Sequence, residues 1–350
     1  MENSKRLLKF LEKNARELSP LLILTHDYPD PDAIASAFAL KYLAERYYGI
    51  DSRIVYGGFI STVQNRQMVR LLHIPINKVT GADLRKYQNI ALVDTQPGFG
   101  NNSFPRGKKA AIVLDQHSPV DSRSSKFAIV DTGLSATCEI LAEALLSLGK
   151  PIPPLLATAL VFGIITDTYD LYRARKKNVL KLYLLLLMFC DMKRLIHLKN
   201  PPRTRNFFAM IKKGMEKAAV HGKLIRADLG HVQDPVYVAH IADFLLTYEK
   251  AVWALCTGRH KGKLYVSLRA ASLKGQAQKV LKDVIEDKSR AGGHGAIAGG
   301  SEEVGVGAPE NLWAKHEHEL TARLLSRLKI ENCKKTAPFL PDACIMRGKL

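Results

Sequence analysis

The sequence predicts an α/β protein: a doubly wound parallel sheet forms the first domain, and a smaller α/β domain follows it. Three short runs rich in Val, Ile and Leu, namely Leu22–Leu24, Asn89–Val93 and Ala110–Leu114, alternate with helical stretches. Such runs are typical of strands that are buried on both faces. Strands that alternate with helices along a chain favour parallel pairing.

Histidine and aspartate residues follow each of these runs: His26, Asp30 and Asp32 after the first, Asp94 after the second, and Asp115 and His117 after the third. A fourth apolar run, Phe162–Thr168, carries Asp167 and is likewise expected to be a strand. The carboxyl ends of parallel strands meet at one edge of the sheet, where ligands bind. Because imidazole and carboxylate groups bind divalent cations, the pattern predicts a metal site with enough ligands for two ions.

These motifs resemble those of the DHH phosphoesterase family, which includes RecJ-like exonucleases, inorganic pyrophosphatases and oligoribonucleases that also dephosphorylate 3′-phosphoadenosine 5′-phosphate. Four segments resemble the family's metal-binding motifs: His26–Asp32, Val93–Thr95, Asp115–His117 and Thr166–Thr168. Two later segments, Ser267–Arg269 and the glycine-rich Arg290–Gly300, resemble the DHH-associated C-terminal domain. The resemblance covers roughly residues 20 to 320 and is closest to the branch of oligoribonucleases and 3′-phosphoadenosine 5′-phosphate phosphatases.

The resemblance implies a site with two divalent ions, most often manganese. By this resemblance, His26, Asp30 and Asp94 hold the first ion. Asp32, Asp94 and Asp167 hold the second, so that Asp94 bridges the two. The catalytic residues implied are Asp94, Asp115 and His117, with His117 in contact with the phosphate under attack.

One position departs from the family pattern. The middle residue of the third motif, a histidine ligand of the second ion in the family, is Gln116 here. An amide offers a metal only its carbonyl oxygen, which is a weaker ligand for first-row metals than imidazole. We therefore expect Gln116 to serve as a weaker ligand and the second site to need more metal.

Five residues are candidates for substrate binding: Arg269, Gly292, Gly293, His294 and Ser135. The resemblance implies that Arg269 and His294 bind the phosphates of a nucleotide, as suits their hydrogen-bond donors. Composition alone leaves the glycine-rich segment open to interpretation as a flexible loop. Ser135 precedes a helix expected to run through Leu148, where it is either an ordinary N-cap or a phosphate contact.

The sequence divides at Asn200–Thr204, whose two prolines stop a helix. We expect a catalytic domain over residues 1–190 that begins with an amphipathic helix over 1–19, a linker over 191–205 and a substrate-binding domain over 206–331. The tail, 332–350, lacks periodicity and is expected to be disordered or loosely packed. The substrate-binding domain's expected elements are strands at 223–226, 236–238, 251–255 and 263–268 and a helix over 276–287.

The chain has 350 residues, of which 47% are hydrophobic, and a formal net charge of +19. This composition indicates a globular protein, and the charge favours anionic partners such as RNA or nucleotides. Basic residues concentrate between the expected domains: Arg173, Arg175, Lys176, Lys177, Lys193, Arg194, Lys199, Arg203, Arg205, Lys212 and Lys213. They form either a solvated helix face or a surface that attracts phosphates.

The five cysteines form no C-x-x-C pair, which argues against zinc fingers and a disulfide framework. The apolar run Leu182–Cys190 is too short to cross a bilayer, which takes about 20 residues. It is expected to form either a buried helix or a contact in a homodimer. With no signal peptide recognised, we expect a cytoplasmic protein without membrane contact.

The expected function is manganese-dependent hydrolysis, by two-metal activation of water, of short oligoribonucleotides or 3′-phosphoadenosine 5′-phosphate. One alternative is a phosphodiesterase for cyclic or linear dinucleotides. Another is a nucleotide- or RNA-binding protein in which Gln116 has weakened catalysis. The retained carboxylates argue against this last alternative, because burying them without a metal is costly.

Overall fold

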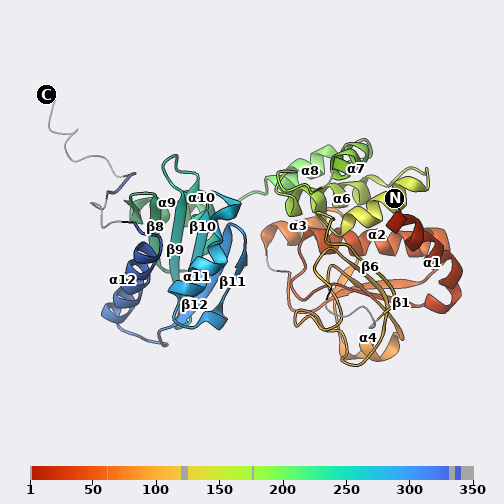
Figure 1. Ribbon diagram of the computed structural model, residues 1–350, viewed down its shortest axis with the longest axis horizontal. Coiled ribbons are helices and arrows are strands. Elements are labelled where there is room, and N and C mark those ends of the chain that lie inside the picture. The colour runs from red at the N-terminus through yellow and green to blue at the C-terminus, as the bar shows by residue number, and fades with distance from the viewer. Residues whose placement is uncertain (1, 61, 120–124, 176, 331–335, 340–350) are drawn as a thin grey trace. The chain divides into compact units, whose positions relative to one another are not determined.

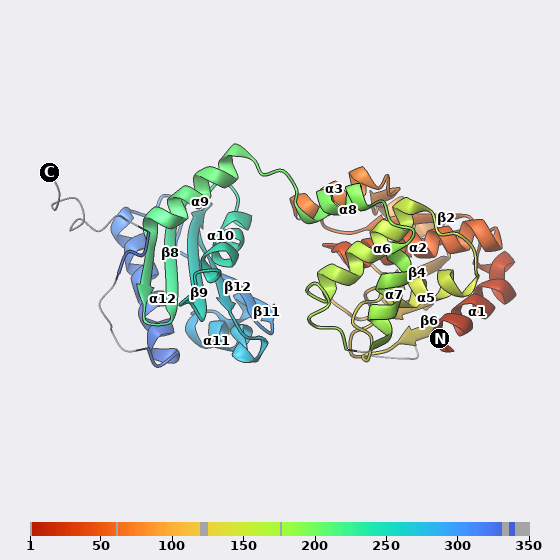
Figure 2. The same ribbon diagram turned by 90° about the horizontal axis from the view of Figure 1, so that it is seen from above.

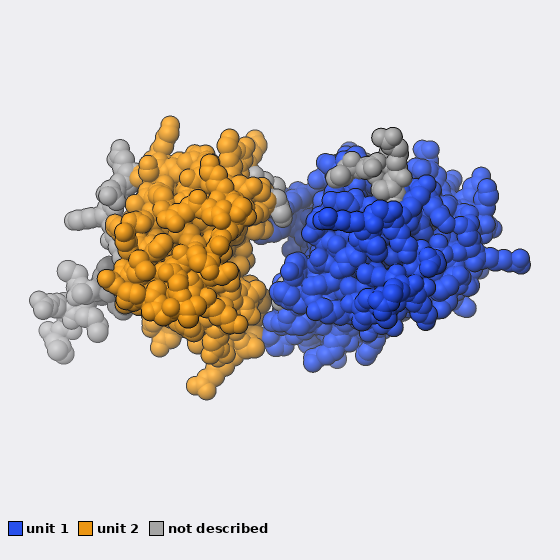
Figure 3. All heavy atoms as spheres, turned by 90° about the horizontal axis from the view of Figure 1, so that it is seen from below, with its two compact units in different colours: residues 1–202 blue, residues 203–350 orange. Residues whose placement is uncertain are grey.

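The computed structural model describes residues 2–60, 62–119, 125–175, 177–330 and 336–339. The chain divides into two compact units, residues 1–202 and 203–350, which Figure 3 colours separately. Each unit has its own β-sheet and its own hydrophobic cores. Each therefore buries its own set of apolar side chains.

The first unit alternates strands and helices along most of its length. Its strands are β1 (Leu21–Leu24), β2 (Ser52–Tyr56), β3 (Ile76–Lys78), β4 (Asn89–Val93), β5 (Ala110–Asp115) and β6 (Ser125–Val130). Its helices are α1 (Glu2–Leu18), α2 (Pro31–Tyr48), α3 (Val63–Leu71), α4 (Gly81–Lys86), α5 (Cys138–Ser147), α6 (Pro154–Asp167), α7 (Lys177–Leu187) and α8 (Met192–Lys199).

Within the described residues, these six strands form one parallel sheet in the order β3-β2-β1-β4-β5-β6. The order reverses between the neighbours β1 and β4. At such a reversal the loops that follow the two strands run to opposite faces of the sheet and leave a crevice between them. The residues that follow β1 and β4 therefore lie where α/β proteins bind ligands.

Both faces of the sheet are buried, as the apolar runs predicted. Leu21 and Ile23 of β1 pack in the core formed with α1, α2, α5 and α6. Leu22 and Leu24 point to the opposite face and pack in a separate core with Leu84 of α4. Figure 1 shows α4 on the other side of the sheet from α2. Helices thus cover both faces, and the predicted doubly wound α/β fold is confirmed.

Two predictions for the first unit are wrong in detail. The fourth apolar run, Phe162–Thr168, is not a strand but the last part of α6, which is buried along most of its length. Short apolar runs do not distinguish a buried strand from a buried helix. Ser135 is not an N-cap, because α5 begins at Cys138 after Thr137.

The apolar run Leu182–Cys190 lies mostly in α7. Leu182 and Leu186 are buried against the first unit's core, whereas Leu184 and Met188 are 55% and 79% exposed. The run is therefore a half-buried helix, and whether its exposed side contacts a second copy stays a prediction. None of the helices in the described residues is both long and apolar enough to cross a membrane.

The second unit contains a mixed sheet with helices packed on it. Its strands are β7 (Ala218–His221), β8 (Leu224–His231), β9 (Trp253–His260), β10 (Lys263–Ala270), β11 (Ala291–His294) and β12 (Ile297–Glu303). Its helices are α9 (Arg205–Lys217), α10 (Val236–Leu246), α11 (Ala277–Val284) and α12 (Glu310–Arg327), with short 3₁₀ turns at Leu273–Gly275 and Lys288–Arg290. In the described residues the order is β11-β12-β10-β9-β8-β7, and all pairs except β8 with β9 are antiparallel.

The predicted second α/β domain is confirmed, with one correction. Residues 236–238 were expected to form a strand but begin α10, an apolar helix that packs on β9 and β10. The glycine-rich segment, which composition alone left open to interpretation as a flexible loop, forms the antiparallel hairpin of β11 and β12. Glycine is usually disfavoured in strands, which is why the sequence pattern concealed this hairpin.

The first unit extends through Pro202, so most of the expected linker belongs to it. Helix α8, inside the expected linker, packs against α3 and α6, and Figure 2 shows it beside α3. The expected tail lies outside the described residues except for residues 336–339.

Candidate metal centre

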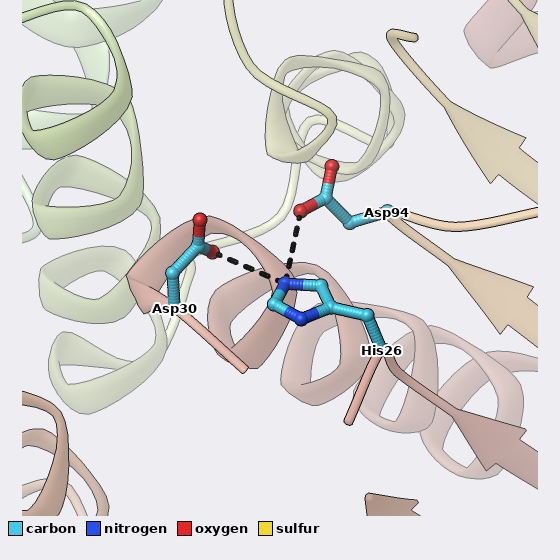
Figure 4. A group of neighbouring side chains, drawn as sticks. All are labelled: His26, Asp30 and Asp94. Carbon is cyan, nitrogen blue, oxygen red and sulfur yellow. Dashed lines mark ion pairs between the residues drawn. The ribbon is translucent and has the colours of Figure 1, made fainter. Parts of the chain in front are cut away.

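Three of the expected ligands meet at the carboxyl-end edge of the first sheet (Figure 4). His26 follows β1, Asp30 caps the first turn of α2, and Asp94 directly follows β4. Nε2 of His26 lies 3.6 Å from Oδ2 of Asp94 and 4.0 Å from Oδ1 of Asp30. The imidazole and the two carboxylates therefore point at a common position.

The backbone of Asp94 is strained. Its φ is +58°, in the left-handed region that residues with a side chain rarely adopt. Its N–H donates to the carbonyl of Leu114, which continues the pairing of β4 with β5 by one residue. This conformation holds a carboxylate that is only 4% exposed beside His26, and strain of this kind is common at functional sites.

A second group of ligands shares Asp94. Nδ1 of His117 lies 2.8 Å from Oδ1 of Asp115 and 3.7 Å from Oδ1 of Asp94. Asp115 is fully buried and also accepts a 2.6 Å hydrogen bond from Nε2 of Gln96. Asp115 is therefore placed to orient His117. Asp94 therefore lies between His26 and His117, with one carboxylate oxygen toward each.

Asp32 is buried completely, and its two carboxylate oxygens face the start of α5. They accept hydrogen bonds from the backbone N–H groups of Thr137 (2.7 Å) and Cys138 (2.8 Å). An aspartate of α2 thus caps α5, which explains why Ser135 is not needed as a cap. The expected role of Asp32 as a metal ligand stays a prediction.

Asp167 and Gln116 are in direct contact. Nε2 of Gln116 donates to Oδ2 of Asp167, at the C-terminal end of α6. In this arrangement the Nε2 group of Gln116 fixes the orientation of Asp167. A metal would bind Gln116 through its other amide atom, Oε1. The position occupied by histidine in the resembled motif thus holds a side chain that contacts another expected ligand.

Burial and neighbouring negative charges raise the pKa values of two carboxylates at the site. Burial and the charges of Asp94 and Asp167 raise the pKa of Asp32 well above its usual value. Burial and the charges of Asp30 and Asp94 raise the pKa of Asp167 to about 7. Negative charges this close together are a sign of a site that is completed by cations.

The pKa values of the two histidines are raised as well, because the neighbouring carboxylates favour the protonated imidazole. Burial lowers the pKa of His26, but the nearby carboxylates of Asp30 and Asp94 outweigh it and raise the value to about 10. The hydrogen bond to Asp115 raises the pKa of His117 to about 9. A divalent ion at His26 would replace this proton with a larger positive charge. The donor set and its unbalanced negative charge therefore fit divalent cations.

The expected substrate-binding residues of the second unit have distinct surroundings. Arg269 is 7% exposed, pairs through Nε with Asp243, and donates from Nη1 to Ser267 (2.7 Å) and to the carbonyl of Ala298 (3.1 Å). These contacts fix the guanidinium on β10. Its contact with substrate stays a prediction.

The two glycines differ from each other. Gly293 has φ +143°, and a Cβ there would lie 2.2 Å from the carbonyl oxygen of Ile297 across the hairpin. A Cβ at Gly292 would instead have open space around it, with no neighbouring atom of another segment within 4 Å. Gly293 is thus required by the fold, whereas Gly292 leaves room for a ligand. The backbone of His294 ends β11, and its side chain lies outside the described residues.

Ser135 is 7% exposed and its hydroxyl accepts a 2.8 Å hydrogen bond from the backbone N–H of Arg175. Arg175 also donates from its guanidinium to the carbonyls of Thr132 and Leu134. Arg175, one residue of the predicted basic cluster, therefore stabilises the fold. Whether Ser135 contacts substrate stays a prediction.

Two polar residues near the site were missed in the sequence. The hydroxyl of Thr137 donates to Asp94, and Gln96 donates to Asp115. Gln96 lies two residues after a predicted ligand, a position that would have justified its inclusion. Thr137 gave no such signal, because its role depends on α5 being placed against α2.

A family model described as "DHH family, N-terminal domain" matches residues 20–164. An uncharacterized protein of Methanocaldococcus jannaschii is 31% identical over 341 residues, which are 96% of this chain and 70% of that protein. An uncharacterized protein of Mycoplasma genitalium is 26% identical over 163 residues, 47% of this chain and 49% of that protein.

A solved structure, that of an exopolyphosphatase-related protein from Bacteroides fragilis, has a TM-score of 0.67 and 14% identity, and covers 93% of this chain and 98% of that one. At this identity the likeness shows a shared fold. Together with the motifs at the sheet edge, the comparisons show that the chain belongs to the DHH family. The predicted family is confirmed, and the expected branch within it stays a prediction.

Proposed function

We propose that this protein is a metal-dependent phosphoesterase that hydrolyses short oligoribonucleotides, 3′-phosphoadenosine 5′-phosphate, or both. The observation that carries the proposal is the position of Asp94, whose two oxygens lie 3.6 Å from Nε2 of His26 and 3.7 Å from Nδ1 of His117. One carboxylate thus lies beside both an imidazole of the first ligand set and the proposed general acid, so the groups for metal binding and for proton transfer meet at Asp94.

Two ligand sets would hold the ions. The first is His26, Asp30 and Asp94, and the second is Asp32, Asp94, Asp167 and Gln116. Two divalent ions, most suitably manganese, would act as Lewis acids toward the phosphate and promote deprotonation of the attacking water. The mixture of imidazole and carboxylate donors suits manganese better than calcium.

His117 is the proposed general acid. In the absence of metal, the hydrogen bond to Asp115 raises the pKa of His117 to about 9, and Asp115 holds Nδ1 of the ring. Nε2 is then the nitrogen directed to substrate, where it donates to a phosphate oxygen or protonates the departing oxygen. Asp115 acts through His117 as a positioning residue.

The second unit would supply substrate contacts through Arg269, Gly292, Gly293 and His294. The net charge of +19 supports an anionic substrate. The resemblance favours a short nucleotide substrate, and a linear or cyclic dinucleotide is the alternative within the same chemistry.

The proposal is tested by manganese-dependent hydrolysis of an end-labelled RNA dinucleotide and of 3′-phosphoadenosine 5′-phosphate. Wild type should release product and Asp94→Asn should not. Asp94→Asn keeps the shape of the side chain while removing the charge, and a melting curve checks that the variant folds. If wild type with manganese leaves both compounds intact, the enzymatic proposal fails. Tight nucleotide binding under those conditions would favour a binding protein with weakened catalysis, as Gln116 suggests.

A further inference from the structure

The second unit contains a cavity of about 810 Å³ that the candidate metal centre does not use. It lies where the turn at Lys261 and Gly262 joins β9 to β10, between the C-terminal part of α9 and the first turns of α12. Arg269 lies near the other end of β10, roughly 20 Å along the strand. The cavity is therefore separate from the expected substrate residues.

One wall of the cavity is built by close backbone packing. The carbonyl of Gly262 accepts hydrogen bonds from the N–H groups of Val304 and Gly305, both 2.9 Å long. A Cβ at Gly262 would lie 2.7 Å from the backbone nitrogen of Val306, and its φ is +75°. The glycine thus allows the turn and the 304–308 loop to form a fixed wall.

Some of the charges in the cavity are already balanced. Arg259 donates to Glu310 (2.7 Å) and to Glu317 (2.7 Å), and its guanidinium lies over the ring of Trp313, 5.4 Å from the centroid. Arg226 pairs with Asp228 through Nη1. These pairs engage all three carboxylates that line the cavity.

Other positive groups remain unbalanced. Among the described residues, Lys213, Lys217 and Lys261 have no carboxylate partner, and Nζ of Lys213 only donates to the carbonyl of His231, 3.4 Å away. Nε of Arg226 is buried, and no hydrogen-bond partner for it is found in the described part of the chain. The cavity thus has three ammonium groups from two elements and a guanidinium N–H that requires an acceptor.

We infer that this cavity binds the phosphate backbone of a single-stranded oligonucleotide. Ammonium groups on both α9 and the β9–β10 turn suit several phosphates in succession better than one. Trp313 is only 8% exposed and Arg259 covers it, so no base stacks on this ring. Recognition here is therefore by backbone charge and independent of base sequence.

The test measures binding of a fluorescent single-stranded RNA of about ten nucleotides, a length within the usual range for such sites. The full chain is used with EDTA present, so that the result does not depend on catalysis or on the proposed function. Lys217→Gln combined with Lys261→Gln is compared with Lys250→Gln combined with Lys329→Gln, which removes the same number of charges. Lys329 follows α12, roughly 18 Å along the helix from Glu317, the nearest cavity residue on it. Lys250 precedes β9, at the opposite end of this strand from the cavity.

The variant with Lys217→Gln and Lys261→Gln should bind about 10-fold more weakly at low salt. Its plot of log affinity against log salt should be shallower by about 1.4, because each phosphate contact to a single strand contributes about 0.7. Affinity and slope equal to those of the variant with Lys250→Gln and Lys329→Gln would overturn the inference. Unchanged RNA binding with loss of pyrophosphate binding would also overturn it, since the cavity would then take a free phosphate compound.

Discussion

The hydroxyl of Thr137 donates a 2.8 Å hydrogen bond to Oδ1 of Asp94, while the backbone N–H of the same threonine donates to Asp32. One residue before α5 therefore holds two of the expected metal ligands. Hydrogen-bond partners of this kind orient ligands and tune their affinity for metal.

Thr137→Val should therefore weaken metal binding by about 10-fold, within the usual range for lost outer partners of metal ligands. The valine keeps the shape and the backbone N–H but removes the donor to Asp94. Thr137→Ser keeps the hydroxyl and should bind nearly as well as wild type. Manganese titrations monitored by calorimetry compare the three proteins, and equal affinities for Val and Ser variants would contradict this role.

Metal affinity should rise with pH. Without metal, Asp167 has a pKa of about 7 and His26 about 10, so at neutral pH His26 is protonated and Asp167 partly so. Metal binding requires both groups without their protons, so it releases protons, and acidification below pH 7 opposes it increasingly.

Calorimetry at one pH in buffers of different ionisation enthalpy measures the number of protons released. We expect about one or more at pH 7. Metal binding with no proton release, or with an affinity that is constant from pH 6 to 8, would contradict the prediction. It would show that the metal does not displace protons from His26 and Asp167.

Gln116→His should lower the manganese concentration needed for half-maximal activity. Imidazole is a better ligand for first-row metals than an amide oxygen, and the second ion should therefore bind more tightly. The substitution also removes the contact between Gln116 and Asp167. Gln116→Ala, which loses that contact without gaining a ligand, is the matched control. Equal metal midpoints for wild type and Gln116→His would refute the prediction.

Gly293→Ala should destabilise the protein by about 1–3 kcal/mol, because the residue has φ +143° and a Cβ would meet the backbone of Ile297. Gly292→Ala, next to it, should leave the melting temperature nearly unchanged, since its Cβ has open space. Thermal melts of the two variants test this contrast. If Gly292→Ala also raises KM without changing stability, its expected contact with substrate gains support.

The sequence was sufficient for the parts of the fold that depend on local pattern. The runs at Leu22–Leu24, Asn89–Val93 and Ala110–Leu114 became β1, β4 and β5, because strands buried on both faces need continuous apolar residues. The strand predicted at residues 236–238 was wrong, because a three-residue apolar pattern suits a strand and a helix equally.

The sequence also determined which ligand types lie at the sheet edge, since the positions of His26 and Asp94 after their strands follow from chain order alone. Tertiary structure decided what each side chain contacts. That Asp32 caps α5, that Thr137 donates to Asp94 and that Gln116 contacts Asp167 all depend on helices distant in sequence being packed together. Such contacts carry no local periodicity, so only the folded chain specifies them.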